Sequence, residues 1–203
     1  MSIKKECEDF WQGQFGDEYT HRNDLDLIPS VLRTWAAILE KLSSKVESVF
    51  EFGTNSGINL DAIKILLPYV NTYGVEINKY ACDIANNKGH KVINKSFYDL
   101  EFDKKFDLVF TYTVLIHVPP ENLKNIYEKI YNLSSKYILI CEYFSRNPEE
   151  ITYRGFKNKL YKRDFASELL ESYPSLELVD YRFFWRNDNM FKEDDITYFL
   201  FKK

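Results

Sequence analysis

A glycine-rich turn followed by a carboxylate one strand later is the feature of this sequence best suited to chemistry. An apolar run ends at Gly53, where the missing side chain lets the backbone approach a ligand closely. Asn55 tolerates a left-handed backbone, and Gly57 lets the following helix pack near the strand. Glu76 ends the next apolar run, about twenty positions on, where an acidic residue binds a ribose diol. The pair predicts a nucleoside-containing cofactor at the carboxyl ends of parallel strands.

The spacing of the glycines in this turn distinguishes between the known nucleotide-binding motifs. A dinucleotide fingerprint needs three glycines as G-x-G-x-x-G, and a P-loop needs a lysine, and this turn has neither. Glu51, Gly53, Asn55 and Gly57 instead resemble the first motif of class I, Rossmann-like methyltransferases that bind S-adenosylmethionine. The resemblance implies that the turn lies beneath the methionine part of the cofactor, that Glu76 binds the ribose, and that S-adenosylhomocysteine is the product.

The periodicity of apolar residues predicts an α/β fold for the whole chain, which the resemblance specifies as a methyltransferase fold. We expect a mostly parallel seven-stranded sheet, helices on both faces, and an antiparallel C-terminal hairpin. The expected strands cover 48–52, 73–77, 90–94, 106–112, 136–141, 176–181 and 196–201. The expected helices cover 25–42, 57–67, 80–88, 121–133 and 164–172.

Composition limits the class of protein. At 203 residues the chain fits a single domain, 1–203, and its net charge of -4 argues against non-specific nucleic-acid binding. The three cysteines follow neither a metal pattern nor a disulfide pattern, which fits a reducing cytoplasm. No apolar run is long enough to span a bilayer. We expect a cytoplasmic enzyme without a metal and without nucleic-acid or membrane partners; the oligomeric state stays open.

The N-terminal segment, residues 1–24, mixes aromatic residues with glycines and makes a poor amphipathic helix. We expect it to cover the cofactor, although an arm that only shields apolar surface is the alternative. Residues 10–23 resemble the F-W-x-G-x-F-G-D-E-Y-x-x-R-N run of small methylases encoded with pseudaminic and legionaminic acid biosynthesis. That resemblance extends to residues 153–165. The resemblance indicates a nonulosonic sugar pathway more clearly than it indicates which reaction the protein catalyses.

The resemblance also suggests individual cofactor contacts. Related methyltransferases bind the methionine carboxylate with a phenol and an arginine before the first strand, which Tyr19 and Arg22 match in type. Trp11 could cover the adenosyl or methionine part. After the third strand, Phe97 could form an apolar wall for adenine and Ser96 or Asp99 its polar contact, with a plain polar loop as the alternative. The remaining cofactor candidates lie at strand ends: Thr54, Ile77, Thr111 and Thr113.

Three residues are candidates for handling the methyl acceptor. His117 follows the fourth strand, and its neutral ring could accept a proton, although a structural role or a cofactor contact is the alternative. Glu142 and Tyr143 end the fifth strand, where open α/β sheets place their ligands; Glu142 could equally be a buried or solvated glutamate. The charged insert 144–162 is positive and could face an anionic substrate, or it could be a solvated loop.

These observations predict methyl transfer from S-adenosylmethionine to a hydroxyl or an amine or amidine nitrogen of a small anionic sugar. The acceptor would be a nonulosonic acid, such as pseudaminic or legionaminic acid, or a precursor. Two alternatives stay open. A nucleotide-sugar or nicotinamide oxidoreductase would need a third glycine and a Tyr-x-x-x-Lys pair, which residues 112–116 do not supply. A non-catalytic partner protein could keep the cofactor pocket without turnover.

Overall fold

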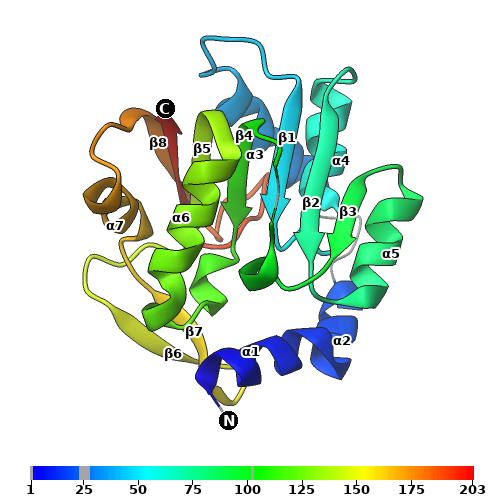
Figure 1. Ribbon diagram of the computed structural model, residues 1–203, viewed down its shortest axis with the longest axis vertical. Helices are drawn as coiled ribbons and strands as arrows, with labels where there is room; N and C mark the ends of the chain where they lie inside the picture. The colour runs from blue at the N-terminus through cyan, green and yellow to red at the C-terminus, as the bar shows by residue number, and fades with distance from the viewer. Residues whose placement is uncertain (1, 23–27, 102) are drawn as a thin grey trace.

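A seven-stranded sheet with the order β3-β2-β1-β4-β5-β9-β8 organises the computed structural model, which describes residues 2–22, 28–101 and 103–203 (Figure 1). The first five strands are parallel, and the last two form an antiparallel hairpin beside β5. The predicted methyltransferase fold is therefore confirmed. The strands are β1 Ser48–Phe52, β2 Asn71–Glu76, β3 Lys91–Asn94, β4 Phe106–Tyr112, β5 Ser134–Glu142, β8 Glu177–Phe184 and β9 Ile196–Lys202.

Helices cover both faces of the sheet because the central strands are apolar on both sides. One face carries α3 (Ile28–Leu39), α4 (Ile58–Leu66) and α5 (Lys79–Asn87), and the other carries α6 (Leu123–Leu133) and α7 (Phe165–Ser172). Trp35 on α3 is fully buried, with its ring centroid 4.7 Å from that of Phe110. It belongs to the core, as its helical spacing predicts.

The N-terminal segment differs from its prediction, because it forms two helices. Helix α1 (Ile3–Gln12) begins at Ser2, whose side chain accepts a hydrogen bond from the Lys5 N–H. It ends at Gly13, whose extended backbone separates it from α2 (Gln14–Arg22). Both helices lie across the carboxyl ends of the parallel strands, at the bottom of Figure 1. Capping and tertiary packing therefore outweigh the poor helical pattern of this segment.

The charged insert is a β-hairpin. Strands β6 (Glu149–Tyr153) and β7 (Phe156–Lys162) form a separate two-stranded sheet. Arg154 and Gly155 make the turn, and both have positive φ angles (49° and 89°), as tight hairpin turns require. The sequence indicated only a charged excursion here, because its alternation is weak.

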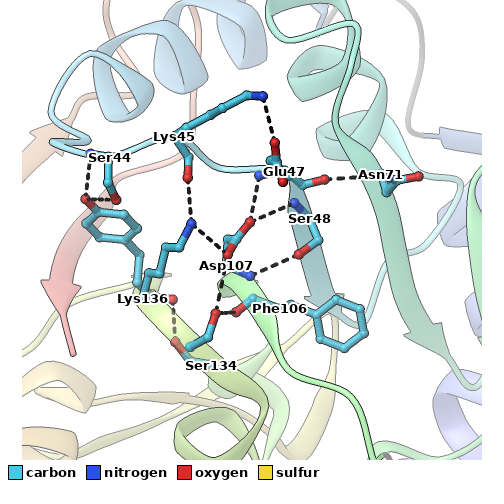
Figure 2. Close-up of polar contacts among 11 residues, drawn as sticks. Ser44, Lys45, Glu47, Ser48, Asn71, Phe106, Asp107, Ser134 and Lys136 are labelled. Atoms are coloured by element: carbon cyan, nitrogen blue, oxygen red, sulfur yellow. Dashed lines mark hydrogen bonds and ion pairs between the residues drawn. The ribbon is translucent and has the colours of Figure 1, made fainter.

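Asp107 joins three segments at the sheet end opposite the cofactor turn (Figure 2). Its Oδ2 accepts hydrogen bonds from the N–H groups of Glu47 (2.7 Å) and Ser48 (3.3 Å), and Lys136 Nζ lies 3.0 Å from Oδ1. These contacts fix the start of β1 against β4 and β5. By aligning β1, β4 and β5, they also set the relative positions of the carboxyl ends of these strands, where the cofactor turn lies.

Candidate functional site

A cavity of about 460 Å³ lies at the carboxyl ends of the parallel strands, which is where open α/β sheets bind ligands. Most of the residues predicted to contact the cofactor line it. They come from five separate segments: Trp11, Tyr19, Glu51, Gly53, Thr54, Asn55, Glu76, Ile77, Ser96, Phe97 and Thr113. His117 also lines the cavity. Of the predicted residues, Arg22, Gly57, Thr111, Glu142 and Tyr143 do not line it.

The glycine turn has the backbone that its sequence predicts. Gly53, Asn55 and Gly57 have φ angles of 66°, 48° and 84°, a left-handed conformation that favours glycine and asparagine. A Cβ added at Gly53 would lie 2.6 Å from Val114 Cγ2, and one at Gly57 would lie 2.9 Å from the His90 ring. A side chain at either position would clash with these neighbours, so both glycines are needed for close packing. Gly57 does not itself line the cavity.

Glu76 connects the turn to the end of β2. Its Oε2 accepts a hydrogen bond from the Asn55 N–H (2.7 Å), and its Oε1 accepts one from the Asn78 N–H (2.8 Å). Burial raises the pKa of this carboxyl, and the backbone donors partly oppose that shift. Each carboxylate oxygen can accept a second hydrogen bond, so the side chain can bind a diol while it orients the turn.

Glu51 carries an oxygen that suits a cationic ligand group. Its Oε1 accepts a hydrogen bond from Asn59 Nδ2 (2.7 Å), whose Oδ1 accepts one from Trp35 Nε1 (2.9 Å). Glu51 Oε2 is buried at the cavity and has no hydrogen-bond partner within the described chain. Burial holds the pKa of this carboxyl well above its usual range. An ammonium group in the cavity would stabilise the charged form. Asn59 and Trp35 support Glu51, and the sequence did not assign them to the site.

The adenine end of the predicted site lies after β3. Phe97 lines the cavity, and its ring centroid lies 4.7 Å from that of Tyr98 and 6.3 Å from that of Phe52. Ser96 Oγ donates a hydrogen bond to Glu8 Oε1 at 2.5 Å. The polar residue expected here therefore also binds α1, and Glu8 is a lining residue that the sequence did not indicate.

Polar contacts dock α1 and α2 over the cavity. Thr20 Oγ1 lies 3.0 Å from Asn55 Oδ1, and Asn78 Nδ2 donates to Asp17 Oδ1 at 2.7 Å. Trp11 and Tyr19 border the cavity, whereas Arg22 is exposed with its guanidinium near aromatic rings of α2. Arg22 therefore does not line the cavity, and its contact with the methionine carboxylate stays a prediction. The arginine lies at the end of α2, beyond the residues that face the cavity.

Gly16 lets α2 approach α1, and replacing it with alanine is expected to loosen the lid formed by residues 2–22. An added Cβ would lie 1.9 Å from the Trp11 carbonyl oxygen and 2.8 Å from Asn78 Nδ2. Overpacking of this kind costs about 1–3 kcal/mol, so proteases should cleave Gly16→Ala faster within the lid. Gly13→Ala is the matched control, because its Cβ would only reach 3.0 Å from Asp9 O. Equal cleavage of both variants would contradict this role.

The β6–β7 hairpin packs behind the lid and contributes no residue to the cavity lining within the described chain. The Phe156 ring centroid lies 5.0 Å from that of Phe10 and 5.9 Å from that of Phe15. Lys159 is buried, and its Nζ lies 3.6 Å from Cys7 Sγ. The insert predicted to face the substrate therefore supports α1, because its apolar residues face the aromatic residues of the lid.

His117 is held as a neutral ring with a defined tautomer. Its Nδ1 lies 2.6 Å from the Lys159 carbonyl oxygen, and a carbonyl can only accept, so Nδ1 carries the proton. Burial lowers the pKa of the ring to about 4, so His117 is neutral near pH 7. Its Nε2 is then the acceptor nitrogen. Trp11 packs against the ring with centroids 4.5 Å apart.

Glu142 has a structural contact in place of the expected contact with the acceptor. Its carboxylate accepts hydrogen bonds from the N–H groups of Val114 (3.1 Å), Leu115 (3.1 Å) and Ile116 (3.3 Å). Burial raises the pKa of this carboxyl to about 7. Glu142 therefore holds the loop after β4 in place through these hydrogen bonds. The same loop lines the cavity through Val114 and His117.

Tyr143 also lies outside the cavity lining, and it supports a wall that the sequence did not predict. Its OH donates to Asp194 Oδ2 at 2.5 Å, and Tyr112 OH donates to Glu193 Oε2 at 3.1 Å. Asp194, Glu193 and Lys192 line the cavity beside β4 and β9. The sequence indicated only a polar loop before the last strand.

Residues 50–136 match the family model described as a methyltransferase domain. They contain the glycine turn, Glu76 and the loop that carries His117. None of the curated protein sequences compared with the chain matches it.

Solved methyltransferases share the fold at low sequence identity. A 1,6-didemethyltoxoflavin-N1-methyltransferase from Burkholderia thailandensis, with 1,6-didemethyltoxoflavin and S-adenosylhomocysteine, is 15% identical with a TM-score of 0.77; 100% of this chain and 91% of that chain are covered. The magnesium protoporphyrin IX methyltransferase of Synechocystis PCC 6803, with bound S-adenosylmethionine, is 14% identical with a TM-score of 0.68, covering 100% and 98%. A plantazolicin methyltransferase with S-adenosylhomocysteine is 11% identical with a TM-score of 0.68, covering 99% and 95%.

The match to the methyltransferase-domain model over residues 50–136 and the shared fold agree with the predicted class, an S-adenosylmethionine-dependent methyltransferase, and with its cofactor. The residues present fit that cofactor, because Glu51 offers a buried oxygen that has no partner among the described residues, and Glu76 offers a carboxylate at the turn. Within the described chain, no cluster of three potential metal ligands occurs. None of its helices is both long and apolar enough to cross a membrane. The finer likeness to nonulosonic acid methylases stays a prediction.

Proposed function

We propose that this protein transfers the methyl group of S-adenosylmethionine to a hydroxyl or an amine or amidine nitrogen of a small sugar-type molecule. The observation that carries the cofactor assignment is the buried Glu51 oxygen at the cavity, which has no hydrogen-bond partner in the part of the chain that the structure describes. Charge recognition of the cofactor's ammonium would satisfy this oxygen. The bound cofactor supplies an electrophilic methyl group on a sulfonium, so the protein has to align the acceptor and exclude water.

The order of the strands assigns the parts of the cavity. Adenine would lie beside Phe97 after β3, the ribose at Glu76 after β2, and the methionine part at the turn after β1. The acceptor would then lie next along the sheet, beside β4, where Glu193 and Asp194 line the cavity. Carboxylates accept hydrogen bonds from the hydroxyls of a sugar or from the N–H groups of an amidine.

The charged residues that line the cavity change which acceptor we expect. Carboxylates from four segments line the cavity, and Lys192 is the only lysine or arginine among the described lining residues. This lining does not favour an anionic group deep in the site. We therefore favour a neutral sugar or one that carries an amidine. A nonulosonic acid would fit with its own carboxylate placed at Lys192.

His117 is the side chain best placed to accept a proton or a hydrogen bond from the acceptor. It lines the cavity, and its Nδ1–H is held by the Lys159 carbonyl, so its Nε2 remains an acceptor. A hydroxyl acceptor needs a base during transfer, whereas a nitrogen needs only its lone pair aligned with the methyl group.

Titration calorimetry with S-adenosylmethionine and S-adenosylhomocysteine tests the cofactor site. We expect both to bind, and Glu76→Ala to weaken binding by about 1–3 kcal/mol, as expected for the loss of a charged hydrogen bond. Glu171→Ala, an exposed glutamate on α7, is the matched control. If neither ligand binds the unaltered protein, the proposed function is wrong. If Glu76→Ala binds normally, the ribose lies elsewhere.

Release of S-adenosylhomocysteine during incubation with candidate acceptors tests the substrate class. The panel should contain neutral sugars, amidino sugars, and nonulosonic acids with their precursors. Faster release with amidino or neutral sugars would support the proposal. Release only with acceptors that are not sugars would overturn the sugar assignment while leaving the cofactor assignment intact.

A further inference from the structure

Strand β8 forms one edge of the main sheet and leaves an aromatic patch uncovered. Tyr181 and Phe183 are 64% and 56% exposed, although both belong to β8. The Tyr181 ring stacks on Phe199 of β9 at 6.0 Å, and Phe144 lies 6.1 Å from Phe199. An unpaired edge offers N–H and C=O groups to another strand, and clustered exposed aromatic side chains mark association surfaces.

We propose that a second copy of this chain pairs with this edge, with the two β8 strands antiparallel about a two-fold axis at Tyr181. Such pairing would join the two sheets into one continuous sheet. The aromatic patches would then meet on one face, because residues directly opposite each other in an antiparallel pair point to the same side.

The charges of β8 select this register. Asp180 and Arg182 are two positions apart on β8, so their side chains lie on the same face of the sheet. Their cross-strand neighbours on β9 are Leu200 and Tyr198, respectively. With the axis at Tyr181, Asp180 faces the partner's Arg182, and Arg182 faces the partner's Asp180. An axis at Asp180 or at Arg182 would place like charges directly opposite each other, which is destabilising. Opposite charges therefore favour one alignment over its two neighbours.

The opposite face of β8 supplies the apolar contact. Tyr181 would face its own copy across the axis, flanked by Phe183 from each chain. A bulge between Leu178 and Asp180 shortens the regular ladder, so the aromatic side chains have to contribute much of the buried area. Asp180 is oriented by a hydrogen bond from Tyr198 OH, which fixes its carboxylate before association. The structure thus combines an exposed edge, apolar surface and self-complementary charge.

Sedimentation velocity at tens of micromolar tests the proposal with charge reversals. We expect the unaltered protein to be a dimer. Arg182→Glu and Asp180→Lys should each raise the dimer dissociation constant about tenfold or more, because each puts like charges in both pairs. Mixing the two variants should restore a dimer, because opposite charges then face each other again. The exposed Tyr69→Glu is the control and should stay dimeric.

Disulfide trapping tests the register and does not depend on Asp180, whose replacement could affect folding. Tyr181→Cys should cross-link to its copy under oxidation, because opposite Cβ atoms at the axis lie close together. Phe183→Cys should cross-link far less, and the native cysteines are buried. A monomeric unaltered protein would overturn the proposal. So would a dimer that persists in both charge reversals, or one that Tyr181→Cys does not trap.

Discussion

Replacing His117 with asparagine is expected to lower kcat about 10²-fold, with little change in S-adenosylmethionine affinity. The asparagine amide can still donate to the Lys159 carbonyl, which now accepts from His117 Nδ1 at 2.6 Å. The variant therefore keeps this contact and loses the acceptor nitrogen. General base catalysis contributes about 10²–10⁴-fold. We expect the lower value, because burial lowers the pKa of His117 to about 4 and makes it a weak base.

The measurement is the rate of S-adenosylhomocysteine release with an acceptor found in the screen. His90→Asn is the matched control, because the His90 ring is buried between Thr72 and Asp61 and does not line the cavity. That control should lower stability and leave kcat largely unchanged. An unchanged kcat in His117→Asn would show that the acceptor needs no base, as a nitrogen acceptor with a free lone pair would not.

The part of the cavity lining that we propose binds the cofactor could be predicted, because the residues that shape it are local in sequence. Gly53, Asn55 and Gly57 need left-handed backbone angles, and this need is visible in the residue types. Glu76 could be found because the distance from the turn to the next strand varies little in such folds. Arg22 does not line the cavity, because resemblance alone suggested its role and its position at the end of α2 depends on how that helix packs.

The lining beside β4, where we propose that the acceptor binds, could not be predicted, because it depends on long-range packing. Glu193 and Asp194 reach the cavity from the loop between β8 and β9, which contacts α3 through Arg33 and Asp188 at 2.9 Å. Nothing in a run of polar residues shows that it returns to the site. Glu142 illustrates the same limit. Its position at a strand end suggested a contact with the methyl acceptor. In the structure its carboxylate accepts hydrogen bonds from three backbone N–H groups of the loop after β4.

The pH dependence of stability should change when Glu142 is replaced by glutamine. The pKa of Glu142 is about 7 in the folded protein, against an ordinary value of 4.5, because burial disfavours the charged form. The folded protein therefore retains this proton over a pH range where the unfolded chain has lost it. The stability that Glu142 contributes in this way is present below pH 4.5 and is lost as the pH rises through about 7.

Urea unfolding between about pH 5 and about pH 8 measures this effect. The unfolding free energy of the unaltered protein minus that of Glu142→Gln should fall by roughly 2–3 kcal/mol over this range. Glu171→Gln, an exposed glutamate on α7, should show a flat difference. A flat difference for Glu142→Gln as well would mean that its carboxylate stays ionised at the low end of the range.

The same substitution links stability to binding. The glutamine oxygen can still accept from the N–H groups of Val114 and Leu115, which now share Glu142 Oε1, but the Ile116 N–H would meet an amide donor. Val114 packs where a Cβ of Gly53 would lie, so a shift of this loop would alter the floor of the cofactor turn. We therefore expect Glu142→Gln to bind S-adenosylhomocysteine more weakly at pH 8. Unchanged affinity would show that the loop keeps its position without the carboxylate.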